Sequence, residues 1–269
     1  MLSFPTTTAK ENLKKNYHSS TIQRALDILN LFKVHTTMSF AEIQEILGFN
    51  KSTLFRVLST LQANKYLRKG EQGQYQLGLN VFILGNSVSR EYQLKNVVSP
   101  YLEAVSQGIE LTVHLGILDG MDVIIVAKAE PNKRIRMVSR IGGSVPAHCT
   151  GQGKTLLAFS PKETVEKIIN TQGLQRFTPN TICTADGLFE ELGAIRSRGC
   201  AIDNSEHERH IRCVAVPILD EIGKIEAALS ITGTVFDFPD DHAIQKSVNL
   251  LEEVRDKIRI ELGYANKAS

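Results

Sequence analysis

The chain has 269 residues, of which 42% are apolar and 22% are charged. This is ordinary globular composition, which argues against extensive disorder, and the length suits two domains better than one. No apolar run approaches the roughly 20 residues that a membrane helix needs, and the N-terminus lacks a signal-peptide pattern. The sequence therefore predicts a cytoplasmic protein of two domains.

The cysteines predict free thiols, because no C-x-x-C pair occurs among Cys149, Cys183, Cys200 and Cys213. Charge is distributed unevenly along the chain. Up to Tyr92 there are 11 Lys and Arg against 6 Asp and Glu, and the remainder has 20 against 23. The basic first part is therefore the part expected to meet a polyanion.

A flexible arm is expected over residues 1–18, which are polar and aperiodic. The first helix is expected to follow, since Ser20 and Gln23 fit a capping box. Its inward stripe is predicted at five apolar positions, namely Ile22, Ala25, Leu26, Leu29 and Phe32.

A second short helix is predicted by the capping box that Ser39 and Glu42 form. Its inward residues are expected to be Phe40, Ile43, Ile46 and Leu47. Gly48 fits the left-handed residue that ends a helix, and Asn50 is a natural N-cap for the next one.

The next helix, from Lys51 to about Asn64, decides the interpretation of this domain. Its buried stripe is expected at Leu54, Val57, Leu58 and Leu61, and the opposite face carries Ser52, Arg56 and Ser59. Two short helices joined by a tight glycine turn are typical of a helix-turn-helix, whose second helix lies in the major groove. Arginine can read guanine there, and serine can bond phosphates or bases.

Residues 66–69 and 74–77 flank a glycine-containing turn and predict the hairpin of a winged helix-turn-helix over residues 19–78. Residues 79–93 predict a linker helix with Leu79, Phe82 and Ile83 on one side, as a surface for dimer contact. Small domains of this kind also bind proteins, so an adaptor function stays open on this evidence.

Residues 94–265 are expected to form an α+β domain with an antiparallel sheet. Ser99 and Pro100 fit the start of a helix, and Asp119-Gly120 fits the turn of a hairpin. The other elements expected are a strand over 134–143, helices near 153–170 and 187–198, a strand pair around residues 220–223, and a long helix over 239–262.

The segment TGQGKT, residues 150–155, suggests phosphate binding, but a true P-loop needs a glycine where His148 stands. Nucleotide hydrolysis is therefore not expected. Backbone N–H groups of residues 151–153 at a helix N-terminus predict a carboxylate pocket, and a plain tight turn into a helix fits the sequence equally well.

The polar segment from Asp203 to Cys213 contains His207 and His210, and a hydrolase or metal-dependent enzyme built on it is the alternative function. No complete metal motif is present. Cys213 opens an apolar strand, where cysteine is more often a buried apolar residue than a nucleophile. A polar loop that lines a pocket is the favoured interpretation, with no catalytic residue, metal or cofactor expected.

Three N-terminal segments, STIQRALDILNLF, NKSTLFRVLSTLQANKYL and GQYQLG, resemble the first helix, recognition helix and wing of the IclR family of bacterial transcriptional regulators. RMVSRIGGSVPAHCTGQGKTLLAF, RSRGCAIDNSEHERHIRCVAVPILD and AALSITG resemble the signatures of the family's effector domain. The resemblance extends from about Ser20 to Gly263.

The resemblance implies a winged helix-turn-helix and a GAF-like effector domain, in a dimer or tetramer that binds double-stranded operator DNA without catalytic activity. Lys51, Ser52, Thr53 and Arg56 match recognition-helix positions that face DNA, and Arg24 matches a phosphate contact. Ser59, from the helical wheel, and Lys69, from the wing, complete the expected DNA-binding set.

The family's pocket for small organic acids falls on six positions of this chain: Gly151, Gln152, Asp203, Cys213, Ser230 and Thr232. The expected effector is a small organic or sugar acid, whose hydroxyl suits Asp203. Gln152 replaces a residue that is small in the family, and His210 stands where glycine is common. Both are expected to distinguish this pocket from those of relatives.

Overall fold

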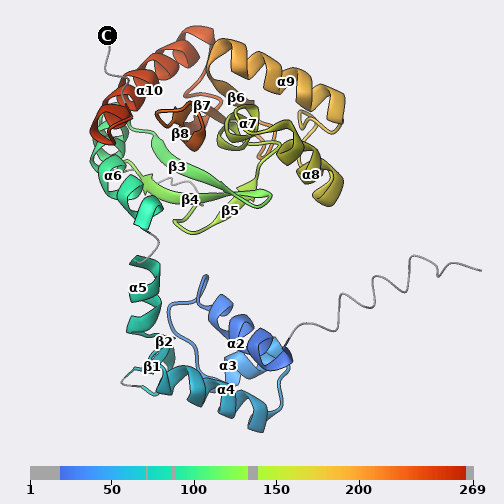
Figure 1. Cartoon of the computed structure of the whole chain (residues 1–269), viewed down its shortest axis with the longest axis vertical. Helices are drawn as coiled ribbons and strands as arrows, with labels where there is room; N and C mark the ends of the chain where they lie inside the picture. Colours follow the sequence, from blue (N-terminus) through green and yellow to red (C-terminus); the bar gives the residue numbers. More distant parts are fainter. Residues whose placement is uncertain (1–18, 71, 87–88, 133–138, 265–269) are drawn as a thin grey trace, which may run out of the picture. The chain divides into compact units, whose positions relative to one another are not determined.

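The computed structural model describes residues 19–70, 72–86, 89–132 and 139–264 (Figure 1). The arm predicted over residues 1–18 lies outside these ranges. The chain divides into two compact units, Met1–Ser89 and Arg90–Ser269, each of which is considered by itself. No helix in the described ranges combines the length and apolar content needed to span a bilayer.

The first unit has the helices and the wing that the sequence predicts. Its elements are α2 (Ser20–Leu31), α3 (Phe40–Leu47), α4 (Lys51–Ala63), β1 (Leu67–Lys69), β2 (Tyr75–Leu77) and α5 (Leu79–Asn86). The predicted inner stripe of α4 is confirmed, since all four of its members are buried: Leu54, Val57, Leu58 and Leu61. They pack against Ile28 of α2 and Ile43 of α3 to form the core.

Two of the three helix starts are confirmed. Ser39 and Glu42 form the capping box, and the Asn50 side chain accepts the N–H of Thr53 at 2.8 Å. The predicted box of Ser20 and Gln23 is wrong, because Ser19 is the N-cap of α2. Gln23 instead donates to Asp27 at 2.9 Å, one helical turn further on.

The inner face of α2 differs in part from the prediction. Ile28 is fully buried and was not in the predicted stripe, whereas Ile22 and Leu26 are 62% and 48% exposed. The apolar side chains of α2 occupy a wide arc of the helix surface, so their spacing alone does not show which side of the helix faces the core. Ile46 of α3 was also predicted to face inward and is exposed.

The second unit is built on an antiparallel sheet with the strand order β5-β4-β3-β8-β7-β6. The strands are β3 (Thr112–Asp119), β4 (Asp122–Ala129), β5 (Ser144–Pro146), β6 (Ala201–Asn204), β7 (Ile211–Leu219) and β8 (Ile225–Thr234). The α+β class and the two predicted hairpins, β3-β4 and β7-β8, are confirmed.

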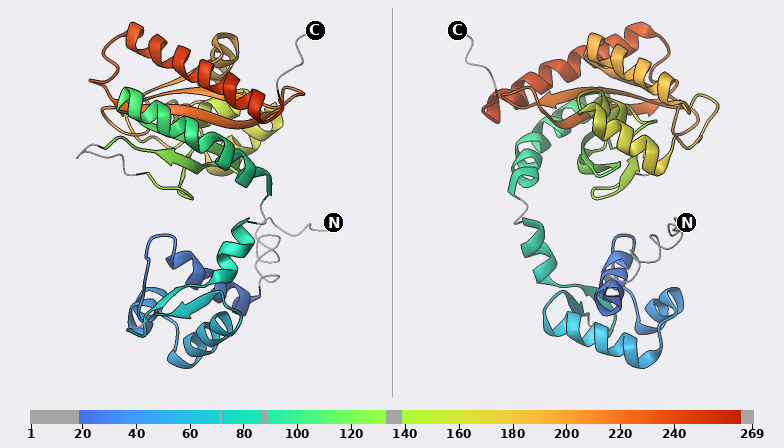
Figure 2. Two further views of the ribbon diagram at one scale, coloured as in Figure 1. Left: turned by 90° about the vertical axis from the view of Figure 1, so that its left-hand side faces the viewer. Right: turned by 45° about the vertical axis from the view of Figure 1, so that its right-hand side comes forward.

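Helices cover both faces of this sheet. The long helices α6 (Ser89–Ile109) and α10 (Asp241–Glu261) lie side by side on one face, where Tyr101 donates to Glu261 at 2.7 Å (Figure 2). The other face carries α7 (Gly151–Ala158), α8 (Lys162–Gln172) and α9 (Ala185–Arg198). Each face therefore has its own apolar core.

Side chains alternate between these two cores along β8. Leu229 and Ile231 join the core beneath α6 and α10. Because neighbouring residues of a strand point to opposite faces, Ser230 and Thr232 lie on the face that carries α7. This alternation places two hydroxyl groups on the face of the sheet that carries α7.

Two helix boundaries in the second unit were predicted wrongly. Pro100 lies inside α6 rather than at its start, because a buried stripe formed by Leu94, Val98, Leu102 and Val105 continues through it. The helix predicted over 153–170 is two helices, since Pro161 is the N-cap of α8 and ends the continuity.

Two strand predictions also need correction. Of the strand expected over 134–143, residues 134–138 lie outside the described ranges, residues 141–142 form a turn, and the strand β5 begins only at Ser144. The short strand β6 was missed, because the polar residues from Asp203 onward concealed it.

The linker helix predicted over 79–93 corresponds to α5 and the start of α6. Residues 87–88 between them lie outside the described ranges, and the exact domain boundaries remain a prediction.

Candidate ligand pocket and DNA-binding face

Strand pairing brings polar side chains from four strands to one face of the sheet. Asp203 of β6 is the partner of Cys213 in β7, which in turn is the partner of Thr232 in β8. On the neighbouring row Ser230 of β8 is opposite His114 of β3. Directly opposed residues of antiparallel strands share a face, so the five side chains gather beneath α7.

The first turn of α7 approaches this row closely. A Cβ atom at Gly151 would lie 2.9 Å from the Cys213 sulfur, and one at Gly153 only 2.1 Å from the carbonyl oxygen of Ala147. Gly151 therefore permits the contact with the polar row, and Gly153 permits the close approach of the segment before α7. The hydroxyl of the N-cap Thr150 accepts the N–H of Gly153 at 3.2 Å, and the first-turn N–H groups before it have no acceptor within the helix.

A cavity of about 100 Å³ lies at this end of α7. Five of the six residues that the sequence placed in a pocket line it: Gln152, Asp203, Cys213, Ser230 and Thr232. Gly151 is not a lining residue and acts through its contact with Cys213. The remaining lining residues are His114, Ile125, Ser139, Val145, Thr150, His207, Glu208 and Ile211.

The lining contains no lysine or arginine side chain among the described residues. Burial raises the pKa of Asp203 to about 7, although the backbone N–H of Glu206 donates to its carboxylate at 2.7 Å. Burial and the charge of Lys128 lower the pKa of His114 to about 3, so its ring is neutral. The cavity therefore has neutral hydrogen-bonding groups and one carboxyl that titrates near neutral pH.

Hydrogen bonds connect several polar groups of the cavity but do not include the hydroxyl of Ser230. The ring nitrogens of His114 lie 2.8 Å from the Ser139 hydroxyl and 3.4 Å from the Thr232 hydroxyl. The buried hydroxyl of Ser230 has no hydrogen-bond partner in the described structure, apart from the weakly polar thiol of Cys213. A ligand in the cavity can supply that missing partner.

Gln152 forms one wall of the cavity. Its side-chain N–H donates to the carbonyl oxygen of Ala228 at 3.0 Å, and its amide oxygen lies over Gly116, where a Cβ atom would be 2.9 Å away. The amide is thus fixed by β8 on one side and accommodated by a glycine of β3 on the other.

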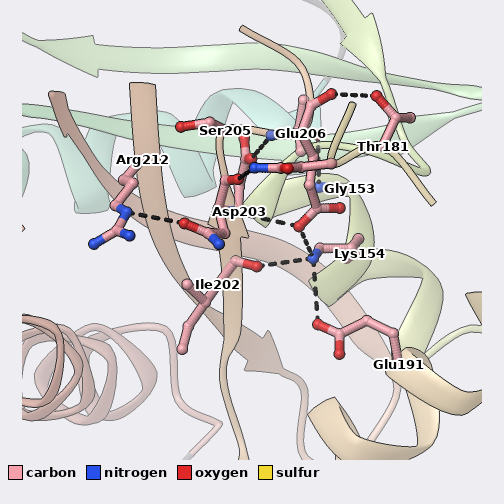
Figure 3. Close-up of polar contacts among 12 residues, drawn as sticks. Gly153, Lys154, Thr181, Glu191, Ile202, Asp203, Ser205, Glu206 and Arg212 are labelled. Atoms are coloured by element: carbon pink, nitrogen blue, oxygen red, sulfur yellow. Dashed lines mark hydrogen bonds and ion pairs between the residues drawn. The ribbon is translucent and has the colours of Figure 1, made fainter. Parts of the chain in front are cut away.

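Lys154, the lysine of the TGQGKT segment, does not line the cavity. Its side chain is 1% exposed, and its ammonium group lies 2.5 Å from Glu206, 3.2 Å from Glu191 and 2.8 Å from the carbonyl oxygen of Ile202 (Figure 3). The lysine therefore holds α7 to the segment that follows β6 and to α9.

The loop between β6 and β7 is not helical, so the two histidines of HERH do not share a helix face. His207 lines the cavity, whereas His210 is exposed and has φ of 65°, a backbone conformation that glycine adopts more readily. Burial raises the pKa of Cys213 to about 11, which keeps its thiol protonated and poorly nucleophilic. Within the described ranges no three His, Cys, Asp or Glu side chains gather as metal ligands do.

Sequence reasoning missed the β3 and β4 side of the cavity. His114 is the residue that a closer reading could have found, because it is a polar side chain within the apolar strand LTVHLGIL. Ser139 carried no such signal, since it lies within the strand that the sequence predicted over 134–143.

The N-terminal unit presents a polar helix face and a groove. Lys51, Ser52, Arg56 and Ser59 of α4 are all exposed. Three of the predicted DNA-binding residues, Arg24, Thr53 and Arg56, line a groove of about 180 Å³ between α2 and α4. Lys69 stands apart on the wing, with its ammonium group 5.3 Å from the centre of the Tyr75 ring.

Two family models match the chain. "IclR helix-turn-helix domain" matches residues 21–71, and "Bacterial transcriptional regulator IclR C-terminal" matches residues 86–260. The HTH-type transcriptional regulator XynR of Escherichia coli K12 is 32% identical over 90% of this chain and 97% of its own length. The transcriptional repressor IclR of the same strain is 30% identical over 87% of each chain.

Solved structures of similar proteins extend over most of the chain. The Thermotoga maritima IclR structure has a TM-score of 0.76 and 31% identity, and covers 92% of this chain and all of its own. An IclR homologue of Microbacterium hydrocarbonoxydans, complexed with 4-hydroxybenzoate, has a TM-score of 0.81 and 25% identity, with 91% and 100% coverage.

Proposed function

The chain belongs to the IclR family of DNA-binding transcriptional regulators, and we propose that a small carboxylic acid in the cavity at the start of α7 changes its affinity for operator DNA. Because both family models describe regulators, the hydrolase or metal enzyme considered for Asp203 to Cys213 is rejected. The helix-turn-helix match likewise replaces the adaptor function by DNA binding.

One observation carries the proposal of an acid. Thr150 and Gln152 at the N-terminus of α7 line the same small cavity as the hydroxyl of Ser230, which has no hydrogen-bond partner other than the Cys213 thiol. The N–H groups at a helix N-terminus favour an anion, and a buried hydroxyl without a partner gains a hydrogen bond when a polar ligand enters. A carboxylate satisfies both groups.

The size and polarity of the cavity support a small acid. Its volume of about 100 Å³ is below that of the apolar cavity of about 150 Å³ that admits benzene, so few non-hydrogen atoms fit inside. Asp203 supplies an acceptor for the hydroxyl of a hydroxy or sugar acid. The relative complexed with 4-hydroxybenzoate, itself a hydroxy acid, supports the chemical class of the ligand and not its size.

For DNA contact we propose the exposed side of α4, with Ser52, Arg56 and Ser59 in the major groove and Lys51 and Thr53 at its border. Arg24 is expected to contact a phosphate from the groove beside α4, and Lys69 to do so from the wing.

Self-association as a dimer or tetramer is also part of the proposal. On α2 the exposed apolar residues Ile22 and Leu26 are one helical turn apart, and on α5 Leu79, Phe82 and Ile83 are 64%, 64% and 53% exposed. Apolar side chains this exposed on neighbouring positions favour burial against a second copy. A symmetric dimer would then match two operator half-sites.

A thermal-shift screen of the full-length chain with small monocarboxylic, hydroxy and sugar acids tests the effector. An acid at a hundred times its Kd stabilises the protein by about 2.7 kcal/mol, which raises the melting temperature by about 5 to 11 °C. Ser230→Ala is expected to reduce that shift, and Ser197→Ala, on the exposed side of α9, to leave it intact. The proposal fails if no acid shifts the melting temperature, or if the acids that do leave operator affinity unchanged.

DNA footprinting of Arg56→Ala tests the reading helix. We expect lost discrimination at one base position, or a salt dependence reduced by about one phosphate contact. An unchanged footprint and affinity would remove Arg56 from the interface.

A further inference from the structure

One side chain on the exposed side of α4 is apolar. Phe55 is 61% exposed, although its helix has a complete buried stripe without it. Every other large apolar residue of α4 belongs to that stripe, so Phe55 contributes nothing to the core of the unit. Its position was not among those that the sequence pattern assigned to DNA contact.

The helical wheel places Phe55 on the same side as the polar reading residues. At about 100° per residue, Phe55 is separated from Ser52 by about 60° and from Ser59 by about 40°. Lys51 and Ser59 are its neighbours one turn before and one turn after. An aromatic ring is thus surrounded by side chains that suit contact with DNA.

The chemistry of the major groove limits what such a ring can meet there. Guanine, cytosine and adenine present hydrogen-bond donors and acceptors along this groove, and only thymine adds an apolar group, its C5 methyl. A phenyl ring has no conventional hydrogen-bond donor or acceptor and gains free energy mainly by covering apolar surface. On a helix lying in this groove, its complement is the thymine methyl group.

We infer that Phe55 is a specificity-determining residue, which selects thymine in each operator half-site by packing against the C5 methyl group. The inference rests on the proposed placement of α4 in the major groove. Phe55 acts beside Arg56: the arginine reads hydrogen-bonding base edges and the phenylalanine reads a methyl group.

A contact with another protein is the competing role for an exposed phenylalanine. The apolar residues proposed above for self-association lie on α2 and α5, and α4 adds only this one large exposed apolar side chain. A single residue surrounded by lysine and serine is a poor centre for a protein interface, which usually combines several apolar side chains.

Chemical substitution of the DNA tests the inference directly. Operator duplexes are first selected from random sequence by the full-length protein, and each thymine of one half-site is then replaced in turn by deoxyuracil, which lacks only the methyl group. For the unmodified protein we expect about a fourfold loss of affinity at one or two positions, equivalent to about 0.8 kcal/mol for one buried methyl group.

The same duplexes are then measured with two variants. Phe55→Ala is expected to bind thymine and uracil equally at those positions. Ile46→Ala, which removes an exposed apolar side chain from α3, is expected to keep the fourfold difference. Circular dichroism checks that both variants keep their fold, and size-exclusion chromatography compares their oligomeric states with that of the unmodified protein.

Three results overturn the inference: no thymine position sensitive to the methyl group, selected operators that lack thymine, or a Phe55→Ala variant that retains the wild-type difference. Loss of self-association in Phe55→Ala, with an unchanged difference between thymine and uracil, assigns the residue to a protein interface instead. If the unmodified protein selects no duplex at all, the result refutes the proposed binding of α4 in the major groove, and the inference about Phe55 falls with it.

Discussion

Replacing Lys154 by methionine is expected to destabilise the second unit strongly. The substitution leaves Glu206, whose side chain is 6% exposed, without its cation. One oxygen of that carboxylate already lacks a hydrogen-bond partner in the described structure, and the carbonyl oxygen of Ile202 loses its donor. Removing one member of a buried ion pair costs about 3 to 5 kcal/mol, because the remaining charge stays desolvated.

An exposed ion pair of nearly the same length is the matched control. Lys257 and Glu253 of α10 are 2.6 Å apart, with side chains 55% and 63% exposed. Lys257→Met is expected to cost about 0.3 to 0.5 kcal/mol, since water screens the pair and solvates the carboxylate that remains. The loss of stability should therefore be roughly tenfold larger for Lys154→Met than for Lys257→Met, because the two ion pairs differ in burial and hardly in length.

Differential scanning calorimetry of the full-length variants gives the comparison. A loss of about 3 to 5 kcal/mol lowers the melting temperature of the second unit by about 6 to 20 °C, and the control should shift it by about 2 °C or less. The double variant Lys154→Met with Glu206→Leu is expected to recover part of the loss, because it removes the orphaned charge. Equal effects of the two lysine substitutions, or strict additivity in the double variant, would refute the reasoning.

The affinity for a carboxylate effector should be constant well below pH 7 and fall as the pH rises through about 7. Burial raises the pKa of Asp203 to about 7, so this residue becomes negatively charged over that range. Its charge then opposes an anion in the cavity, whose lining has no lysine or arginine among the described residues. Titration calorimetry from pH 5.5 to 8.5 checks this, and Asp203→Asn should flatten the profile; a fall that persists in that variant places the titrating group elsewhere. Gly116→Ala should cost about 1 to 3 kcal/mol in thermal denaturation, because its Cβ would lie 2.6 Å from Val123 and 2.9 Å from Gln152. Gly193→Ala, in the interior of α9 with open space around it, should instead stabilise the protein by up to about 1 kcal/mol, and matching signs for the two glycines would contradict the packing argument.

The N-terminal unit was largely predictable, because its signals are local. The capping box at Ser39 and the N-cap Asn50 depend on residues three positions apart, and the period of α4 fixed its four buried residues. The inner half of α2 was predicted less well. Its apolar residues are spread too widely for their spacing to show which side is buried. Packing against α4 buries Ile28 and leaves Ile22 exposed.

The cavity was predictable only where a resemblance supplied residues. No period or spacing relates residue 114 to residue 230, because their pairing depends on the placement of β3 beside β8 in the sheet. The local signals for β8 were present, since Ser230 and Thr232 alternate with leucine and isoleucine. What the sequence could not indicate is which hydroxyl remains without a partner after folding.

The TGQGKT segment shows how one short helix can have two functions that a motif comparison confuses. Gly151 permits the contact with Cys213 of the sheet and Gly153 the close approach of Ala147, while Lys154 points to the segment after β6. Asp203, in β6 just before that segment, lines the cavity and accepts the backbone N–H of Glu206, the partner of Lys154. The cavity is therefore connected to the buried ion pair through Glu206, whose backbone N–H bonds Asp203 and whose side chain pairs with Lys154. A ligand that bonds the first turn of α7 and Asp203 would contact both elements that this ion pair holds together, so Lys154→Met is expected to weaken effector binding as well as the fold.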